Sequence, residues 1–402
     1  MLDATLLIVL LVMLLLGKLL GDLVGRLGFS PLIGQMTAGI LLGPMVLDFV
    51  RLNDSMQMLT DIGILFMMFL MGLSIDLEKV MGETVYKATL ISLCGGTLAF
   101  ATTAVITAML GFSVNSALLV GVSFISTSTA IGFMVLSGFG DRHSKVFKTV
   151  MAAGVIDDIY AILGLALFTS FLFTTIDVRM AFVLLLGVLG FIIFVVSFGR
   201  TITDRLIAFA RKSRDEQPII AFSLILMFFV AWLGQSVNLA SVSGAFLAGT
   251  ILARSQLSYK VITPKIEAIS EGFFIPLFFV YTGVRINAFE IFSSAPVDLV
   301  LVSIPIDVVL FLGVLMAVMA SKYLATWVTT TIIGEYKPKE IHKMALTMMP
   351  MGEYTLVIGQ IGLTMMYDGA PIIDTKLYSV LALVVLTLSI IVPIMLRKAY
   401  EN

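Results

Sequence analysis

Two adjacent carboxylates, Asp157 and Asp158, lie near the middle of 146–173, an apolar stretch that is long enough to cross a lipid bilayer. An ionised aspartate at the centre of a membrane helix costs roughly 2.5–3.5 kcal/mol, so two in succession require a specific role. Neighbouring side chains on one helix point about 100° apart, and each carboxylate therefore faces a different partner. This pattern indicates an ion or proton site.

Two other interpretations of the aspartate pair fit less well. A pair that only anchors a loop end is disfavoured, because apolar sequence continues for several turns beyond it and the basic residues Arg142, Lys145 and Lys148 lie about nine residues or more before it. An intramembrane aspartyl protease needs two carboxylates that face each other and share a proton. Neighbours on one helix cannot do this, so the protease interpretation is excluded.

The apolar stretches on either side of this region carry two interior breaks. The first break is a run of hydroxyl residues, Ser126, Thr127, Ser128 and Thr129. The second combines a helix breaker, a glycine and a carboxylate, namely Pro350, Gly352 and Glu353. Non-helical backbone at membrane depth is tolerated only where it lines a cavity, and there its carbonyls and half-helix ends coordinate ions. Hydroxyl residues also pack helices together, which remains an alternative for the first run taken alone.

One lysine, Lys322, lies far from either end of the apolar run 299–333. Asp307 in the same run is about 22 Å away along a helix and can reach the membrane interface. Snorkelling to the interface is one account of Lys322. A buried anionic partner is the account that we favour, and the nearest anions without an assigned partner are Asp157 and Asp158.

Composition places the whole chain in the membrane. Of 402 residues, 59% are hydrophobic and 13% are charged, and the mean hydropathy is +1.08. A soluble core of this size does not need so much apolar surface, so the excess must face lipid. Cys94 is the single cysteine, and His143 and His342 fall in polar stretches that we interpret as loops. A single cysteine cannot form an internal disulfide, and with two histidines in loops it does not provide a cysteine–histidine metal site. The net charge of −1 gives no indication of a nucleic-acid partner.

Hydropathy predicts about thirteen membrane spans and no cleavable signal peptide. The expected spans are 3–21, 30–47, 57–75, 86–110, 115–138, 146–173, 180–199, 217–234, 238–253, 265–284, 299–333, 343–365 and 376–396. With the N-terminus outside, twenty of the 25 lysines and arginines fall on the inner side and four on the outer side, Lys322 being the remaining one. This bias supports the division, because one missed or invented span would scramble it. The C-terminus is then cytoplasmic.

The two breaks also suggest an internal symmetry. Spans 1–6 and 8–13 form two halves around span 7. Because one half plus the linker span is an odd number of spans, the halves run in opposite directions. The broken span 5 then corresponds to the broken span 12, and span 4 corresponds to span 11. The predicted fold is an all-α polytopic membrane protein with two inverted six-helix repeats and crossing discontinuous helices, as in many secondary transporters.

The order and spacing of several short motifs add a family resemblance. The motifs are Pro31–Pro44, Gly63–Gly72, Ser126–Ala130, Val155–Asp158, Gly244–Gly249, Phe273–Phe279 and Gly352–Glu353. Over nearly its whole length the chain resembles the cation:proton antiporter superfamily, in the second branch. That branch includes Nap-like sodium/proton antiporters and Kef-type, glutathione-gated potassium efflux systems.

The resemblance implies a homodimer with a scaffold and a mobile core that carries the ion like an elevator. The scaffold halves are expected at 1–80 and 216–290, the core halves at 81–175 and 291–402, and the linker helix at 176–215. It also implies that Asp158 binds the cation and that Asp157 pairs with Lys322. Many potassium-efflux members have a neutral residue before their single aspartate, and this chain has Asp157 at that position. The long nucleotide-binding tail of many of those members is not expected, because Asn402 follows the last span closely.

Two positions depart from the family pattern. An arginine often precedes the Gly-Glu pair of the broken twelfth span, where this chain has Met351. An acidic residue is common where this chain has Ser74. The partner of Glu353 is therefore open.

The sequence thus predicts an electrogenic antiporter of the inner (cytoplasmic) membrane that exchanges Na⁺ or Li⁺ for protons without a cofactor. Asp158 and oxygen groups around Ser126–Thr129 would hold a partly dehydrated cation, since hard cations prefer oxygen ligands. The alternatives are a K⁺/H⁺ antiporter and a sodium-coupled organic-solute symporter. An enzyme is disfavoured because no catalytic constellation is visible.

Overall fold

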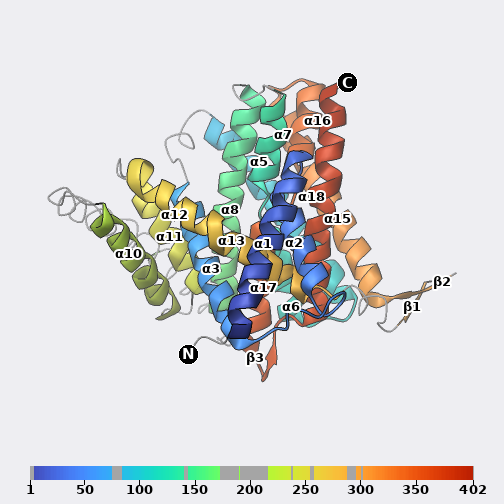
Figure 1. Cartoon of the computed structure of the whole chain (residues 1–402). Helices are drawn as coiled ribbons and strands as arrows, with labels where there is room; N and C mark the ends of the chain where they lie inside the picture. The colour runs from blue at the N-terminus through green and yellow to red at the C-terminus, as the bar shows by residue number, and fades with distance from the viewer. Residues whose placement is uncertain are drawn as a thin grey trace. The chain divides into compact units, whose positions relative to one another are not determined.

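A computed structural model of the chain describes residues 4–74, 84–139, 144–172, 190, 216–236, 239–253, 258–287, 296–299 and 302–401. The described part is mostly helical, as Figure 1 shows. Eight of its helices are long and apolar enough to cross a membrane. The seventh expected span, 180–199, lies outside the described residues except for Gly190, so the expected total of thirteen is not tested.

Contacts divide the chain into two compact units. Unit 1 contains Met1–Leu52, Val80–Ala161 and Phe279–Asn402, and unit 2 contains Asn53–Lys79 and Ile162–Phe278. The described helices of unit 1 are α1 (Ala4–Arg26), α2 (Pro31–Leu42), α5 (Thr84–Met109), α6 (Val114–Ser123), α7 (Thr129–Gly138), α15 (Ile306–Ile333), α16 (Pro338–Thr347), α17 (Glu353–Thr364) and α18 (Thr375–Glu401). Helix α8 (Lys145–Leu172) begins in unit 1 and ends in unit 2. The predicted scaffold and core boundaries stay predictions.

The described helices of unit 2 are α3 (Asp54–Leu73), α10 (Gln217–Ser236), α11 (Ser241–Ala253) and α12 (Thr263–Ile269). Two π-helical turns, η1 (Ser258–Ile262) and η2 (Ser270–Phe274), flank α12, and α13 (Ile275–Arg285) follows and ends in unit 1. The described strands form two short antiparallel hairpins, both in unit 1: β1 (Pro296–Leu299) with β2 (Val302–Pro305), and β3 (Met366–Tyr367) with β4 (Ala370–Pro371).

Glycines of two family motifs let helix backbones touch. In unit 1, a Cβ added to Gly39 of α2 would lie 1.9 Å from the carbonyl oxygen of Val280 in α13. In unit 2, a Cβ added to Gly72 of α3 would lie 2.2 Å from the carbonyl oxygen of Phe246 in α11. Small residues allow such close packing where lipid supplies no hydrophobic driving force between helices. These motifs therefore serve packing.

Three expected boundaries were wrong. The run 299–333 does not form one helix, because α15 begins at Ile306 and the residues before it pair as the hairpin β1–β2. An apolar run cannot distinguish a strand from a helix, and Pro305 disfavours helical backbone for the residue before it. The span 30–47 ends early, at Leu42, where Gly43 adopts an extended conformation. The polar stretch around His342 is the helix α16 rather than a loop, which hydropathy alone does not detect.

Helices α5 and α15 pack against each other in opposite directions. A Cβ added to Gly95 would lie 3.5 Å from Cδ of Lys322, and one added to Gly313 would lie 3.2 Å from the side chain of Ile106. Residue numbers therefore fall along α15 as they rise along α5. An apolar cluster packs beside this pair: Ala88, Ile91, Val146, Val150, Ala152, Ala153, Tyr336, Ile341, Met344 and Met348. Within unit 1, this packing sets the position of Lys322.

Candidate functional site

The two predicted breaks are present and touch each other. Helix α6 ends at Ser123 and α7 begins at Thr129, while α16 ends at Thr347 and α17 begins at Glu353. Between them the chain is non-helical, and Pro350 has no N–H with which to continue a helix. The backbone N–H of Ser128 donates a 2.8 Å hydrogen bond to the carbonyl of Pro350. The crossing of two discontinuous helices is thus confirmed.

A second contact and a close approach hold the crossing together. The hydroxyl of Thr355 in α17 donates a 2.8 Å hydrogen bond to the carbonyl of Ser123, at the end of α6. Gly352 lies so near the first break that an added Cβ would be 2.8 Å from both Cβ and Oγ of Ser128. The glycine of the Gly-Glu motif is therefore required by space, and the two breaks form one closely packed centre.

Lys322 lies in this centre, fully buried, and its ammonium has three acceptors. Its Nζ lies 2.9 Å from Oδ2 of Asp157, 3.0 Å from Oγ1 of Thr127 and 2.5 Å from the carbonyl oxygen of Ile125. An ammonium has three N–H donors, so each can be satisfied. Snorkelling is therefore wrong as an account of Lys322, because the head group is buried and paired.

The half-helix ends add to the electrostatics of the site. The carbonyl of Ile125 lies just beyond the C-terminus of α6, where unsatisfied carbonyls carry partial negative charge. The ammonium of Lys322 offsets that charge. Glu353 is the first residue of α17, where free N–H groups carry partial positive charge. A lysine and an acidic residue, the residue types that these helix ends favour, thus lie at the two ends.

Asp157 is completely buried and uses its two oxygens differently. Oδ2 accepts a 2.5 Å hydrogen bond from the hydroxyl of Thr127 as well as the bond from Lys322. Oδ1 has no hydrogen-bond partner among the described residues. The charges of Asp157 and Lys322 cancel, so this pair contributes no net charge to the site.

Asp158 differs from Asp157 in access. Its side chain is only partly buried, and Oδ1 accepts a 2.7 Å hydrogen bond from the hydroxyl of Ser126. The two aspartates thus differ: Asp157 is fully buried and paired with Lys322, whereas Asp158 keeps a partly exposed side chain.

The structure brings the predicted residues together but gives them different contacts. Ser126 and Thr127 contact the two carboxylates through their side chains, whereas Ser128 uses its backbone N–H and Thr129 begins α7. Their roles in ion binding stay predictions.

Three groups near the site were missed from the sequence. The backbone carbonyls of Ile125 and Met348 accept hydrogen bonds from Lys322 and Thr127. The phenol of Tyr354 is buried without a partner among the described residues. No side-chain pattern marks a carbonyl as an acceptor, although the breaks themselves indicated exposed backbone.

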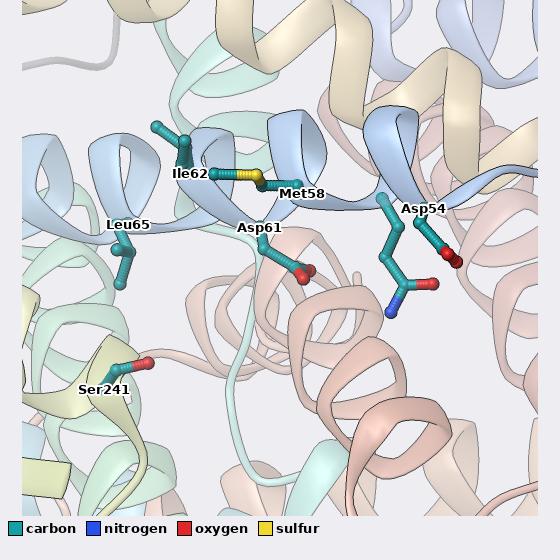
Figure 2. A pocket seen from close by; sticks show the side chains of 7 residues that line it. Asp54, Met58, Asp61, Ile62, Leu65 and Ser241 are labelled. Atoms are coloured by element: carbon teal, nitrogen blue, oxygen red, sulfur yellow. The ribbon is translucent and has the colours of Figure 1, made fainter.

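Unit 2 holds a separate pocket of about 430 Å³, between α3 and the start of α11. Figure 2 shows its acidic side chains, Asp54 and Asp61, together with the apolar Met58, Ile62 and Leu65 of α3. Gln57 and Ser241 complete the lining. It contains none of the predicted site residues.

Comparison with known proteins decides the family. Residues 9–399 match the family model described as sodium/hydrogen exchanger, transmembrane. The chain belongs to the sodium/hydrogen exchanger family. The predicted resemblance to cation:proton antiporters is thereby confirmed, and the exchanger's relatives are transporters rather than enzymes.

Named relatives of this exchanger include a Na⁺/H⁺ antiporter of Enterococcus hirae, 28% identical over 94% of each chain. The Na⁺/H⁺-K⁺ antiporter GerN of Bacillus cereus is 30% identical over 65% of this chain and 67% of its own. The glutathione-regulated potassium-efflux protein KefC of Escherichia coli is 29% identical over 65% of this chain, which corresponds to 42% of its own length.

The fold of the exchanger also matches a solved structure. The sodium proton antiporter MjNhaP1 of Methanocaldococcus jannaschii aligns with 98% of this chain and 95% of its own, at 14% identity and a TM-score of 0.73. The predicted fold class, a helical multi-pass membrane protein of the antiporter type, is confirmed by this match.

Proposed function

We propose that the protein exchanges Na⁺, or Li⁺, for protons, with Asp158 as the carboxylate that carries both. The observation that supports this assignment most directly is the contrast between the two aspartates. Asp157 is buried in a neutral pair with Lys322, whereas Asp158 is partly exposed and accepts a single described hydrogen bond, from Ser126. Asp158, Ser126 and nearby backbone carbonyls supply the oxygen ligands that a hard cation needs.

Exchange follows if Na⁺ and a proton compete for Asp158. A desolvated carboxylate favours its neutral form, so it binds a proton unless a cation takes its place. The energetic cost of moving an unneutralised carboxylate through the membrane interior then prevents reorientation of the empty site. One carboxylate is therefore enough to couple inward proton movement to outward cation movement, or the reverse.

We further propose that the site moves as part of a rigid core within a homodimer, in an elevator-type alternation. In support, the crossing breaks, Lys322 and Asp157 are tied by direct hydrogen bonds within one compact unit. A body held in this way can change its exposure to either side without rearranging its ligands. The expected setting is the inner (cytoplasmic) membrane, with the N-terminus outside.

Electrogenic exchange is the third part of the proposal. A cation at Asp158 attracts the neighbouring Asp157 and weakens its pair with Lys322. A buried ammonium without an anion neutralises by giving up its proton. Lys322 and Asp158 would then each release one proton for one Na⁺. If Lys322 keeps its proton, only one proton moves and transport carries no net charge.

The exchange is tested in proteoliposomes that contain a pH-sensitive dye and no organic solute. We expect proton flux when Na⁺ or Li⁺ is added, together with a transient current. Proton flux that requires an organic solute would instead indicate the symporter, and an electrically silent exchange would contradict the electrogenic proposal.

A K⁺/H⁺ antiporter is the second candidate, because the names of GerN and KefC include potassium. The same assay with K⁺ in place of Na⁺ separates the two. A proton flux that K⁺ drives and Na⁺ does not would replace Na⁺ by K⁺ as the cargo of Asp158.

A further inference from the structure

Three buried polar atoms of α5, α15 and α8, one of them in the Asp157–Lys322 pair, have no hydrogen-bond partner among the described residues. They are Oγ of Ser92 in α5, Oγ1 of Thr326 in α15 and Oδ1 of Asp157 in α8. All three side chains are fully buried. A buried polar group without a partner is costly, and native proteins rarely keep one without a reason. Three on adjoining helices require an explanation.

The register of the helices brings the three residues to similar levels. Along the antiparallel pair α5 and α15, Ile106 contacts Gly313 and Gly95 contacts Lys322, so Ser92 falls opposite Thr326. Thr326 also follows Lys322 by one helical turn and shares its face.

Helix α8 approaches α5 at the same level. A Cβ added to Gly96 of α5 would lie 2.9 Å from the ring of Tyr160 in α8, and Ile91 and Ala153 belong to one apolar cluster. Ser92 therefore lies at about the level of residue 155 in α8. The Asp157 side chain leans toward the N-terminus of its helix, as helical side chains do, and therefore extends from residue 157 toward that level.

We propose that Ser92, Thr326 and Oδ1 of Asp157 together bind one buried water molecule, which holds the Asp157 carboxylate in its orientation. A buried water needs two to four polar partners, and two hydroxyls and a carboxylate oxygen supply three. A cation is the wrong ligand here, because the ammonium of Lys322 lies 2.9 Å from the same carboxylate and would repel it.

The consequence for transport rests on the proposed exchange at Asp158. Held by the water, Oδ1 keeps part of the Asp157 charge away from Lys322. Without it, the carboxylate has no partner on that side and turns both oxygens toward the ammonium and Thr127. Negative charge then moves away from the neighbouring cation site. Ser92 and Thr326 are thus positioning residues, which act on the cation through Asp157.

The water is tested by the thermal midpoint of the purified protein in detergent, for Ser92→Ala, Thr326→Val and the double variant. Each single substitution should lower the midpoint by about 2 °C, because the water loses a partner. The double variant should be little worse than the poorer single, since both hydroxyls hold the same molecule. Singles that raise the midpoint, as removal of unpartnered hydroxyls would, or effects that simply add, would overturn the shared water.

The positioning role is tested by the concentration dependence of Na⁺-driven proton flux. Each single variant should raise the apparent KM for Na⁺ about threefold and leave the maximal rate unchanged. Thr103→Val is the matched control, since Thr103 is a buried hydroxyl of α5 that bonds its own helix at the carbonyl of Ala99. A KM that equals wild type in Ser92→Ala, or that rises equally in Thr103→Val, would overturn the positioning role. The midpoints do not depend on transport, so failure of the water and failure of the exchange proposal are distinguishable.

Discussion

The ammonium of Lys322 lies 2.9 Å from Oδ2 of Asp157, and neither side chain has any exposed surface. Burying one such charge alone is prohibitive, but each partner removes the cost that the other would carry. The exchange that we propose therefore uses Asp158, and not Asp157, as the aspartate that is neutralised during transport.

The pair predicts non-additive stability. Lys322→Ala leaves Asp157 buried without its counter-ion and should cost about 3–5 kcal/mol. The double variant Lys322→Ala with Asp157→Asn removes both charges and should be more stable than Lys322→Ala alone. Denaturation midpoints in detergent of the wild type, Lys322→Ala, Asp157→Asn and the double variant give the coupling energy between the two side chains. Two substitutions whose effects add independently would contradict the pairing.

The crossing of the two breaks predicts a strong effect of a single methyl group. Gly352→Ala should destabilise the protein by about 1–3 kcal/mol, because the added Cβ would overlap Ser128 at 2.8 Å. Gly272→Ala is a matched control within a helical turn, since nothing lies within 4 Å of its added Cβ. Equal midpoints for the two variants would show that the breaks do not touch as described.

A charged cluster outside the spans predicts a pH dependence of stability. Glu335 is paired with Lys145 and, at 2.6 Å, with Lys87, and these lysines lower the pKa of its carboxyl below the ordinary 4.5. Because the folded pKa is the lower one, the stabilisation is present above about pH 4.5 and is lost as the pH falls through the folded value.

Glu335→Gln checks this dependence. The wild type should have the higher thermal midpoint at neutral pH, and the difference should shrink as Glu335 is protonated. The effect should be modest and weaker in high salt, as for other exposed ion pairs. A difference between the two proteins that does not change with pH would contradict an ionic origin.

Competition at Asp158 predicts that the apparent Na⁺ affinity weakens as the pH falls. A ligand that requires the deprotonated carboxylate is displaced by protons. Na⁺ titrations of proton flux at a series of pH values measure the effect. An affinity that stays flat across about pH 5–9, the range that brackets a desolvated carboxylate, would argue for separate cation and proton sites.

The sequence predicted the centre of the site for an identifiable physical reason. Charged side chains in a membrane stretch are so costly that each must have a partner, which pointed from Lys322 to the aspartate pair. Helix breakers at membrane depth likewise indicated the two breaks around Ser126–Thr129 and Pro350. Both inferences concern residue types that have few permitted environments.

The parts that sequence could not supply depend on backbone geometry and on registers between distant segments. The carbonyl of Ile125 became a ligand of Lys322 only because α6 ends there. Ser92 lies opposite Thr326 only because α5 packs against α15, and these two residues are more than 200 positions apart in the sequence. The apolar residues just before Ile306 were predicted to be helical but form a hairpin, since hydropathy does not distinguish a strand from a helix.

The most direct test of the central claim is the Na⁺-driven proton flux of Asp158→Asn in proteoliposomes. The amide keeps the shape of the side chain and removes the charge that both cargoes need. Asp54→Asn, at an exposed carboxylate outside the site, is the control and should exchange like wild type. We predict that Asp158→Asn inserts and elutes like wild type but shows no cation-dependent proton flux at any Na⁺ concentration. Substantial Na⁺/H⁺ exchange by the properly inserted variant would contradict the assignment of Asp158 as the carrier.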